Sequence, residues 1–270
     1  MFDPEYVNSF EIGTKNTLLD GALRFNATAF YYDYKNYQVS KIANRQSVIE
    51  NIDAEVRGAD FELMWTPFQG LQINGSLGLL DSEIKSGASI DTFDRTAGDP
   101  NFAVIKSITG QTCIAPPALI AAAINAVNAG APVASMLQVC LNPAAREGNL
   151  KDLRGNQLPN APKTTLNLGV QYDWTLSGDW DASVRADYYR QGATFARVYN
   201  SDADRLRSRE NVNLSAQVSN APMGVTVEAF VRNLTNEQDV QDFFLSDSVL
   251  FRNGFITDPR TYGVAVSKTF

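Results

Sequence analysis

The sequence predicts an all-β protein, an antiparallel meander that forms part of a transmembrane β-barrel. Three observations predict this fold. Strand-length segments alternate between apolar and polar residues, their connections alternate between short and long, and aromatic residues gather at the segment ends. One of the long connections is expected to contain a short helical excursion.

Nine segments show the two-residue alternation that is typical of β-strands. In one of them, Val184 and Tyr188 share a face, whereas Asp181, Arg185 and Asp187 share the other. Because a soluble β-sandwich also has one dry and one wet face, alternation alone leaves both architectures open. The segments are 6–16, 22–33, 51–66, 71–84, 162–174, 180–195, 210–218, 224–232 and 261–270.

The connections favour the membrane barrel. Short ones of about 5 residues alternate with long ones of about 14 to 77 residues. The short ones carry turn chemistry, as in Asp20-Gly21 and Ser177-Gly178-Asp179. A membrane barrel has tight periplasmic turns and long external loops, and a sandwich has no reason to sort its loops in this way. If the final segment ends in the periplasm, every short turn lies there too.

The aromatic residues agree with this orientation. Trp65, Trp174 and Trp180 lie beside short turns, and Tyr31 and Tyr188 lie near long loops. Amphipathic rings prefer the two bilayer interfaces, so this placement predicts two aromatic girdles.

The long connection contains a charge-free stretch over residues 107–145. Prolines and a glycine interrupt its apolar run, which is therefore unsuited to a spanning helix of about 20 residues. We expect two short helices instead, near 118–129 and 133–139. Cys113 and Cys140 are expected to close this excursion with a disulfide, and two free thiols are the alternative.

Composition excludes several functions. The chain has no histidine, which removes His-based zinc sites and Ser-His-Asp catalysis, and we expect neither enzyme activity nor a cofactor. The net charge of −7 opposes binding to nucleic acid. Several loop carboxylates raise the possibility of calcium, but their spacing matches no EF-hand loop, so a solvated loop is favoured. They are Asp81, Glu83, Asp91, Asp94 and Asp99.

Several stretches together resemble the C-terminal β-barrel part of TonB-dependent outer-membrane receptors. The most specific is Val231-Arg232-Asn233-Leu234-Thr235-Asn236. The others are the strand from Pro4-Glu5 to Gly13-Thr14-Lys15, Gly58-Ala59-Asp60-Phe61-Glu62 with Trp65-Thr66-Pro67, Leu158-Pro159-Asn160-Ala161-Pro162, and the final strand to Phe270. The resemblance covers the chain apart from its long loops.

The resemblance implies a barrel of 22 strands with an N-terminal plug domain, which takes up nutrients such as ferric siderophores with energy from the TonB complex. The nine segments would be its last strands. Because bacterial single-chain barrels have even strand numbers, we expect a fragment that lacks the plug, the TonB box and the first strands. The N-terminus shows no signal-peptide pattern, which agrees with that expectation.

The resemblance also implies roles for particular residues. The long loops 34–50, 85–161 and 233–260 are expected to capture ligand, and Phe270 with Tyr262 to signal the barrel-assembly machinery. The charged residues of the inward face are expected to contact the plug or, for most of them, simply to line a hydrated lumen. They are Arg24, Asp60, Glu62, Asp181, Arg185, Asp187, Glu228 and Arg232.

Expected partners are outer-membrane lipid, the receptor's own plug and N-terminal strands, the TonB complex and the assembly machinery. Two other functions stay open. One is a passive porin-type barrel without a plug. The other is a soluble β-rich carbohydrate-binding module, in which paired carboxylates could also support glycoside chemistry.

Overall fold

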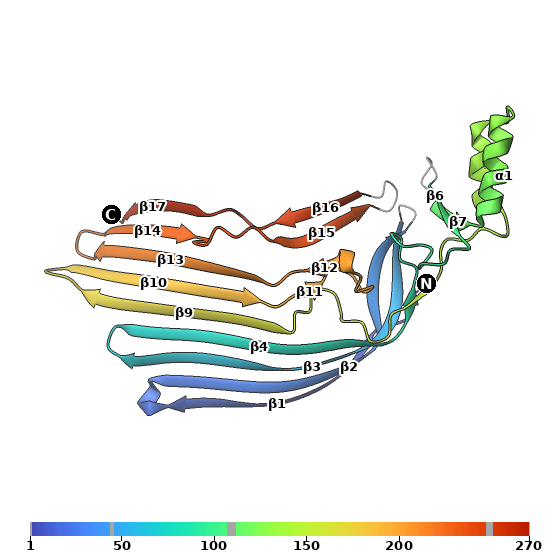
Figure 1. Ribbon diagram of the computed structural model, residues 1–270. Coiled ribbons are helices and arrows are strands. Elements are labelled where there is room, and N and C mark those ends of the chain that lie inside the picture. Colours follow the sequence, from blue (N-terminus) through green and yellow to red (C-terminus); the bar gives the residue numbers. More distant parts are fainter. Residues whose placement is uncertain (1, 44–45, 107–111, 247–250, 270) are drawn as a thin grey trace.

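The computed structural model of the chain describes residues 2–43, 46–106, 112–246 and 251–269. Its main element is one antiparallel sheet of nine strands, each paired with the next, which confirms the predicted fold class. Figure 1 shows the short turns at one end of this sheet and the long excursions at the other. In sheet order the strands are β1 (Tyr6–Leu18), β2 (Leu23–Ala43), β3 (Gln46–Phe68), β4 (Leu71–Ser86), β9 (Thr164–Thr175), β10 (Trp180–Gln191), β13 (Arg209–Asn220), β14 (Val225–Arg232) and β17 (Thr261–Lys268).

The strand register builds one apolar and one polar face. Val184 pairs with Tyr172 and Ala216, whereas the next residue, Arg185, pairs with Gln171 and Ser215. Paired residues point to the same side of a sheet, so the alternation within each strand continues across its neighbours. The apolar side chains are not stacked in a dry interior, because Val184 is 42% exposed and Val266 is 70% exposed. The described sheet is therefore not one half of a sandwich.

The short turn between β3 and β4 lies very close to the neighbouring strand β9. Gly70, between β3 and β4, has a φ of +88°, which favours glycine. A Cβ atom at this position would lie 2.2 Å from the carbonyl oxygen of Asp173 on β9. The turn can therefore approach the neighbouring hairpin only because residue 70 has no side chain.

The long connections hold more strand than the sequence predicts. The prediction of a loop over residues 34–50 is wrong, because β2 and β3 continue as paired strands as far as Ala43 and Gln46. A bulge between Tyr34 and Tyr37 lets the ladder continue beyond the main sheet. Among the described residues, four two-stranded sheets lie in the other connections: β5 (Ala88–Ser89) with β8 (Lys151–Asp152), β6 (Ala103–Lys106) with β7 (Thr112–Ala115), β11 (Thr194–Phe195) with β12 (Arg205–Leu206), and β15 (Val240–Ser246) with β16 (Phe251–Ile256).

A compact apolar core lies at the long-loop end rather than within the sheet. It joins the outer parts of β3 and β4 to the loops before β9 and after β10. This packing explains why these long connections adopt ordered positions. Its buried residues are Ile52, Ala54, Ile84, Leu153, Leu158, Val198 and Tyr199.

The helical excursion consists of α1 (Pro117–Asn128) and the 3-10 helix η2 (Val133–Leu141). The first matches the expected helix closely, and the second is wound more tightly than the expected α-helix. Cys113 and Cys140 are joined by a disulfide with their Cα atoms 5.7 Å apart. The excursion projects from the end of the sheet in Figure 1. No helix in the described residues is both long enough and apolar enough to cross a membrane.

Candidate functional site

The polar face of the sheet carries the charged residues that the sequence analysis selected. Asn26, Glu62, Ser76 and Asn167 form one row across β2, β3, β4 and β9, and the Asn26 amide donates to Glu62 at 3.2 Å. Other rows of this face also contain apolar residues, such as Phe30 and Leu80. Through this register, one face holds all eight selected residues: Arg24, Asp60, Glu62, Asp181, Arg185, Asp187, Glu228 and Arg232.

The centre of the polar face is a network around Arg185. Its guanidinium donates to both carboxylate oxygens of Asp187, at 2.9 and 2.5 Å, and to Gln171 and Asn74 at 3.4 and 3.3 Å. These residues come from three adjacent strands. Gly169 lies beneath the guanidinium, and a Cβ atom there would meet it at 2.6 Å. The network presents fixed donors and acceptors to whatever lies against this face.

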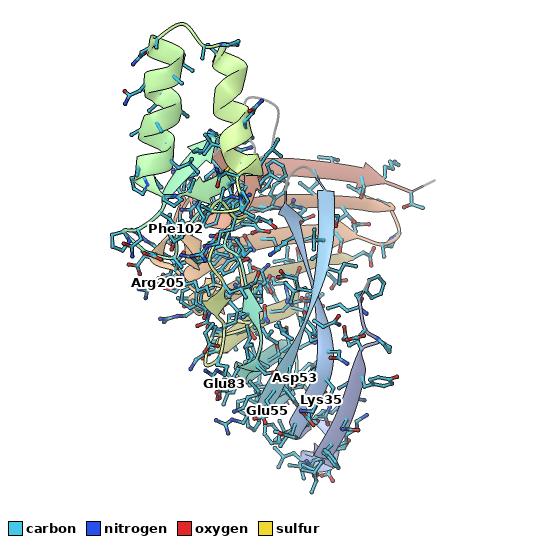
Figure 2. The ribbon with its side chains drawn as sticks, turned by 90° about the vertical axis from the view of Figure 1, so that its right-hand side faces the viewer. Lys35, Asp53, Glu55, Glu83, Phe102 and Arg205 are labelled. Atoms are coloured by element: carbon cyan, nitrogen blue, oxygen red, sulfur yellow. A yellow bond between two sulfur atoms is a disulfide. The ribbon has the colours of Figure 1, made fainter. Side chains whose placement is uncertain are left out.

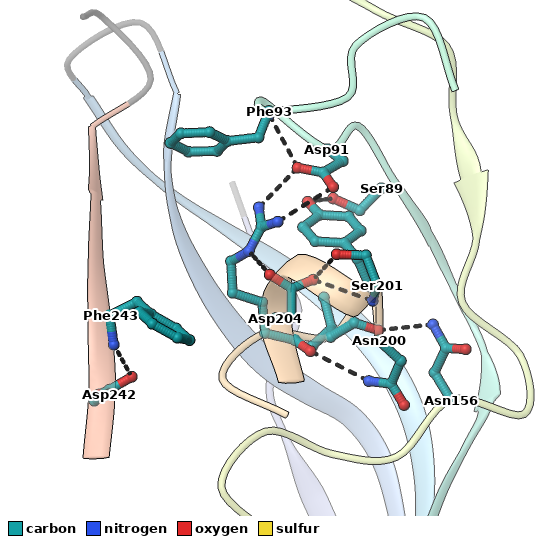
Figure 3. A network of polar contacts seen from close by, with 12 residues as sticks. Ser89, Asp91, Phe93, Asn156, Asn200, Ser201, Asp204, Asp242 and Phe243 are labelled. Atoms are coloured by element: carbon teal, nitrogen blue, oxygen red, sulfur yellow. Dashed lines mark hydrogen bonds and ion pairs between the residues drawn. The ribbon is translucent and has the colours of Figure 1, made fainter. Parts of the chain in front are cut away.

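A second polar network lies at the long-loop end and was missed by the sequence analysis. Arg197 donates to Asp91 at 2.7 and 3.4 Å and to Asp204 at 2.6 Å. Figure 3 labels both carboxylates and marks the contacts of this network with dashed lines. The side chains of Asp91 and Asp204 are each 2% exposed. Burial by itself lowers the pKa of Arg197, but the two carboxylates outweigh it and raise that pKa. Arg197 also lies 5.0 Å from the ring centre of Tyr199.

Tyr199 connects this network to the β2–β3 hairpin. Its hydroxyl donates to the Ile90 carbonyl at 2.9 Å and lies 2.8 Å from the Ser89 hydroxyl. Lys41, from β2, donates to the same Ser89 at 2.9 Å and forms an ion pair with Glu50. Three connections that are distant in sequence are therefore fixed to one another.

A cavity of about 270 Å³ lies between these connections. The hairpin contributes residues 37–41 and Glu50 to its wall, and the other connections contribute Pro159 and residues 196–199. Its lining combines aromatic rings with polar groups, which suits a ligand of mixed polarity. A larger hollow of about 970 Å³ lies along the apolar face, over Tyr172, Val184 and Leu214.

The loop carboxylates do not form a metal site. Asp81 pairs with Arg57 and Lys163, Glu83 with Lys85, and Asp91 with Arg197. Within the described ranges, no cluster of three or more potential ligands exists. Tyr262 is 80% exposed on the apolar face of β17, and Phe270 lies outside the described residues.

Comparisons with known proteins agree with this architecture. A family model described as "TonB dependent receptor-like, beta-barrel" matches residues 1–234. Among solved structures, the ferric yersiniabactin uptake receptor FyuA from Yersinia pestis superposes with a TM-score of 0.64 at 14% identity, over 98% of this chain and 30% of its own. The siderophore receptor PiuA from Acinetobacter baumannii superposes with a TM-score of 0.61 at 19% identity, over 98% of this chain and 28% of its own. The copper transporter OprC superposes with a TM-score of 0.57 at 12% identity, over 100% of this chain and 32% of its own.

Identities this low show a shared fold and nothing finer. The chain spans less than a third of the length of each of these three proteins.

Proposed function

The chain belongs to the TonB-dependent receptor β-barrel family, whose members are bacterial outer-membrane proteins and not enzymes, and we propose that it forms barrel wall and external loops in a receptor that takes up a siderophore-like or other large nutrient. One observation carries this proposal: nine registered strands hold a continuous polar face opposite a continuous apolar face. The apolar face would contact lipid, and the polar face would surround a hydrated interior.

The polar face supports a plugged interior better than an open pore. Its charges are arranged in fixed networks, such as that of Arg185 and Asp187, which offer directional hydrogen bonds to a second protein surface. We assign this face to contact with the receptor's plug domain, and through the plug to action by the TonB complex. The passive porin remains the competing proposal.

The ligand proposal comes from the external end. FyuA and PiuA are named for siderophores and OprC for copper, so chelated metal is the ligand class that their names suggest. In this chain, the cavity beside Tyr37 and Tyr199 would contribute one part of a ligand surface. Further strands of the receptor would pair with the free edges of β1 and β17, since lipid cannot satisfy open sheet edges. Tyr262 and Phe270 keep their proposed role in recognition by the assembly machinery.

Uptake measurements test this function. Cells that express the receptor carrying this chain are given a panel of iron-labelled ferric siderophores, with and without a functional TonB protein. We expect saturable uptake of at least one chelate, and its loss in cells without TonB. Uptake that rises linearly with concentration and ignores TonB would favour a porin. Saturable, TonB-dependent uptake of a different nutrient would keep the receptor proposal and reject the siderophore.

A further inference from the structure

The apolar face ends in a row that carries positive charge. On β3 and β4, the last apolar pair before the long loops is Ala59 and Leu79. Two residues further on the same face, Tyr31, Arg57 and Asp81 form the next row across β2, β3 and β4. Two strand residues correspond to about 7 Å, so this row lies immediately beyond the apolar band.

Two cations in this row share one carboxylate. Arg57 pairs with Asp81 at 2.8 Å, and Lys163 pairs with the other oxygen of Asp81 at 3.3 Å. The backbone fixes Lys163 at this level, because the Leu80 amide donates to its carbonyl oxygen at 3.0 Å. Both cationic side chains are 68% exposed. These three side chains together carry one net positive charge, and the exposed cations can be reached by a further anion.

The row beyond it is different. Asp33, Glu55 and Glu83 lie side by side across β2, β3 and β4, with Lys35 and Lys85 as their partners. Figure 2 shows Lys35, Glu55 and Glu83 near one another at this part of the sheet. With three carboxylates and two lysines this second row is net negative, so the net positive charge lies in the row nearest the apolar band.

This order of surfaces matches the order of layers in an anionic membrane leaflet. The hydrocarbon layer would contact the apolar face, and the bilayer interface above it is where tyrosine is enriched. The lipid headgroups lie beyond that interface, at the level of the cationic row. Tyr31 occupies the boundary position. Anionic headgroups attract arginine and lysine at the membrane surface, and arginine binds phosphate or carboxylate oxygens with two parallel hydrogen bonds.

We propose that Arg57 and Lys163, held together by Asp81, bind the anionic headgroup of a lipid in the outer leaflet. The site takes a phosphate or carboxylate group whose acyl chains lie along the apolar band below it. It is separate from ligand uptake, because it lies on the outside of the wall and requires no transported ligand.

Lipid titration of the purified receptor that carries this chain tests the site. Its thermal midpoint in detergent is followed against lipid A, phosphatidylglycerol and zwitterionic phosphatidylcholine, which gives an apparent affinity for each. We expect the two anionic lipids to bind more tightly than phosphatidylcholine. Replacing both cations, R57Q with K163Q, should weaken anionic lipid binding about 30-fold, because each surface cation contributes about fivefold. D81N should strengthen it.

A matched control is R154Q. Arg154 also forms an exposed ion pair, with Asp152 at 2.6 Å and a side-chain exposure of 69%, but in a loop away from the apolar band. It should leave lipid affinity unchanged. Equal affinity of the native receptor for all three lipids would overturn the proposal, as would an equal loss in R154Q. If the double variant lost a bound protein and kept its lipid affinity, the row would be a protein interface and the proposal would fail.

Discussion

At the residue scale, Tyr199 makes the external network sensitive to pH. Its hydroxyl is buried beside Ser89, and this burial raises its pKa to about 12. An unfolded tyrosine has a pKa of about 10. The folded protein holds the neutral phenol, so the stability that this group contributes is complete below about pH 10 and is lost as the pH rises through about 12.

The titration of Tyr199 is therefore predicted to differ from that of an exposed tyrosine. The phenolate absorbance of the native receptor is measured against pH, and that of Y199F is subtracted. The phenylalanine ring preserves packing in the core but cannot ionise, so the difference isolates one group. We expect its midpoint near 12. A midpoint near 10 would mean that the hydroxyl is exposed and that the external connections are not fixed as described.

Single residues also show how far sequence reasoning reaches. The charges of the polar face were predicted because alternation within a strand is a local property, and Arg185 lies on the opposite face from Val184 whatever its neighbours are. The network of Arg197 could not be predicted in this way. Its partner Asp91 lies 106 residues away, and no periodic pattern links the two. Only the packing of several connections brings them together.

At the scale of elements, the order of the helical excursion depends on the contacts where it leaves and rejoins the rest of the chain. The disulfide between Cys113 and Cys140 closes a loop with a sequence separation of 27 residues. An isolated backbone bridge between Ile114 and Arg146 holds the same base, and α1 has no buried residue of its own. A helix of 12 residues is marginal alone in water, so its order depends on this constraint and on the packing of Leu119 and Ile120 against the small core around Cys113.

Removing the disulfide is predicted to loosen the excursion without unfolding the sheet. A loop of this length gives a stabilisation of about 3.5 kcal/mol in the chain-entropy model. With both cysteines replaced by serine, amide hydrogen exchange in α1 should accelerate strongly. Exchange in β9 and β10, which lie in the main sheet, serves as the internal control and should be unchanged. Unchanged exchange in α1 would show that packing alone orders the excursion.

The elements differ in how well the sequence predicts them. Strands of the membrane band are set by alternation, and all nine were predicted. Seven of them have observed bounds within four residues of the predicted ones, whereas β2 and β3 extend further. The continuation of β2 and β3 beyond Tyr37 was predicted as a loop, because it contains mixed polar residues such as Lys41 and Glu50 on both strands. Its backbone pairing is stabilised by the core around Ile52, which is assembled from other connections.

At the scale of the whole molecule, function depends on the two faces having different surroundings. Among the described strands, β1 and β17 each have one neighbour, so the sheet is an open wall. Such a wall is stable in a membrane only if other strands complete it. Once closed, it separates hydrocarbon from a hydrated interior, and the same substitution should have opposite consequences on its two sides.

A lysine placed on either face tests this separation. Val184 lies on the apolar face between Tyr172 and Ala216, and Gln217 lies on the polar face beside Glu228. In the receptor folded in phosphatidylcholine vesicles, V184K should lower the unfolding free energy by about 2 to 4 kcal/mol, because it puts an ammonium group into hydrocarbon. Q217K should change it by less than about 0.5 kcal/mol, since its charge stays hydrated and faces a carboxylate. Urea unfolding followed by tryptophan fluorescence measures both. If both variants lost the same unfolding free energy, the two faces would lie in the same environment. That result would contradict both the lipid-facing wall and the anionic-lipid site proposed at its rim.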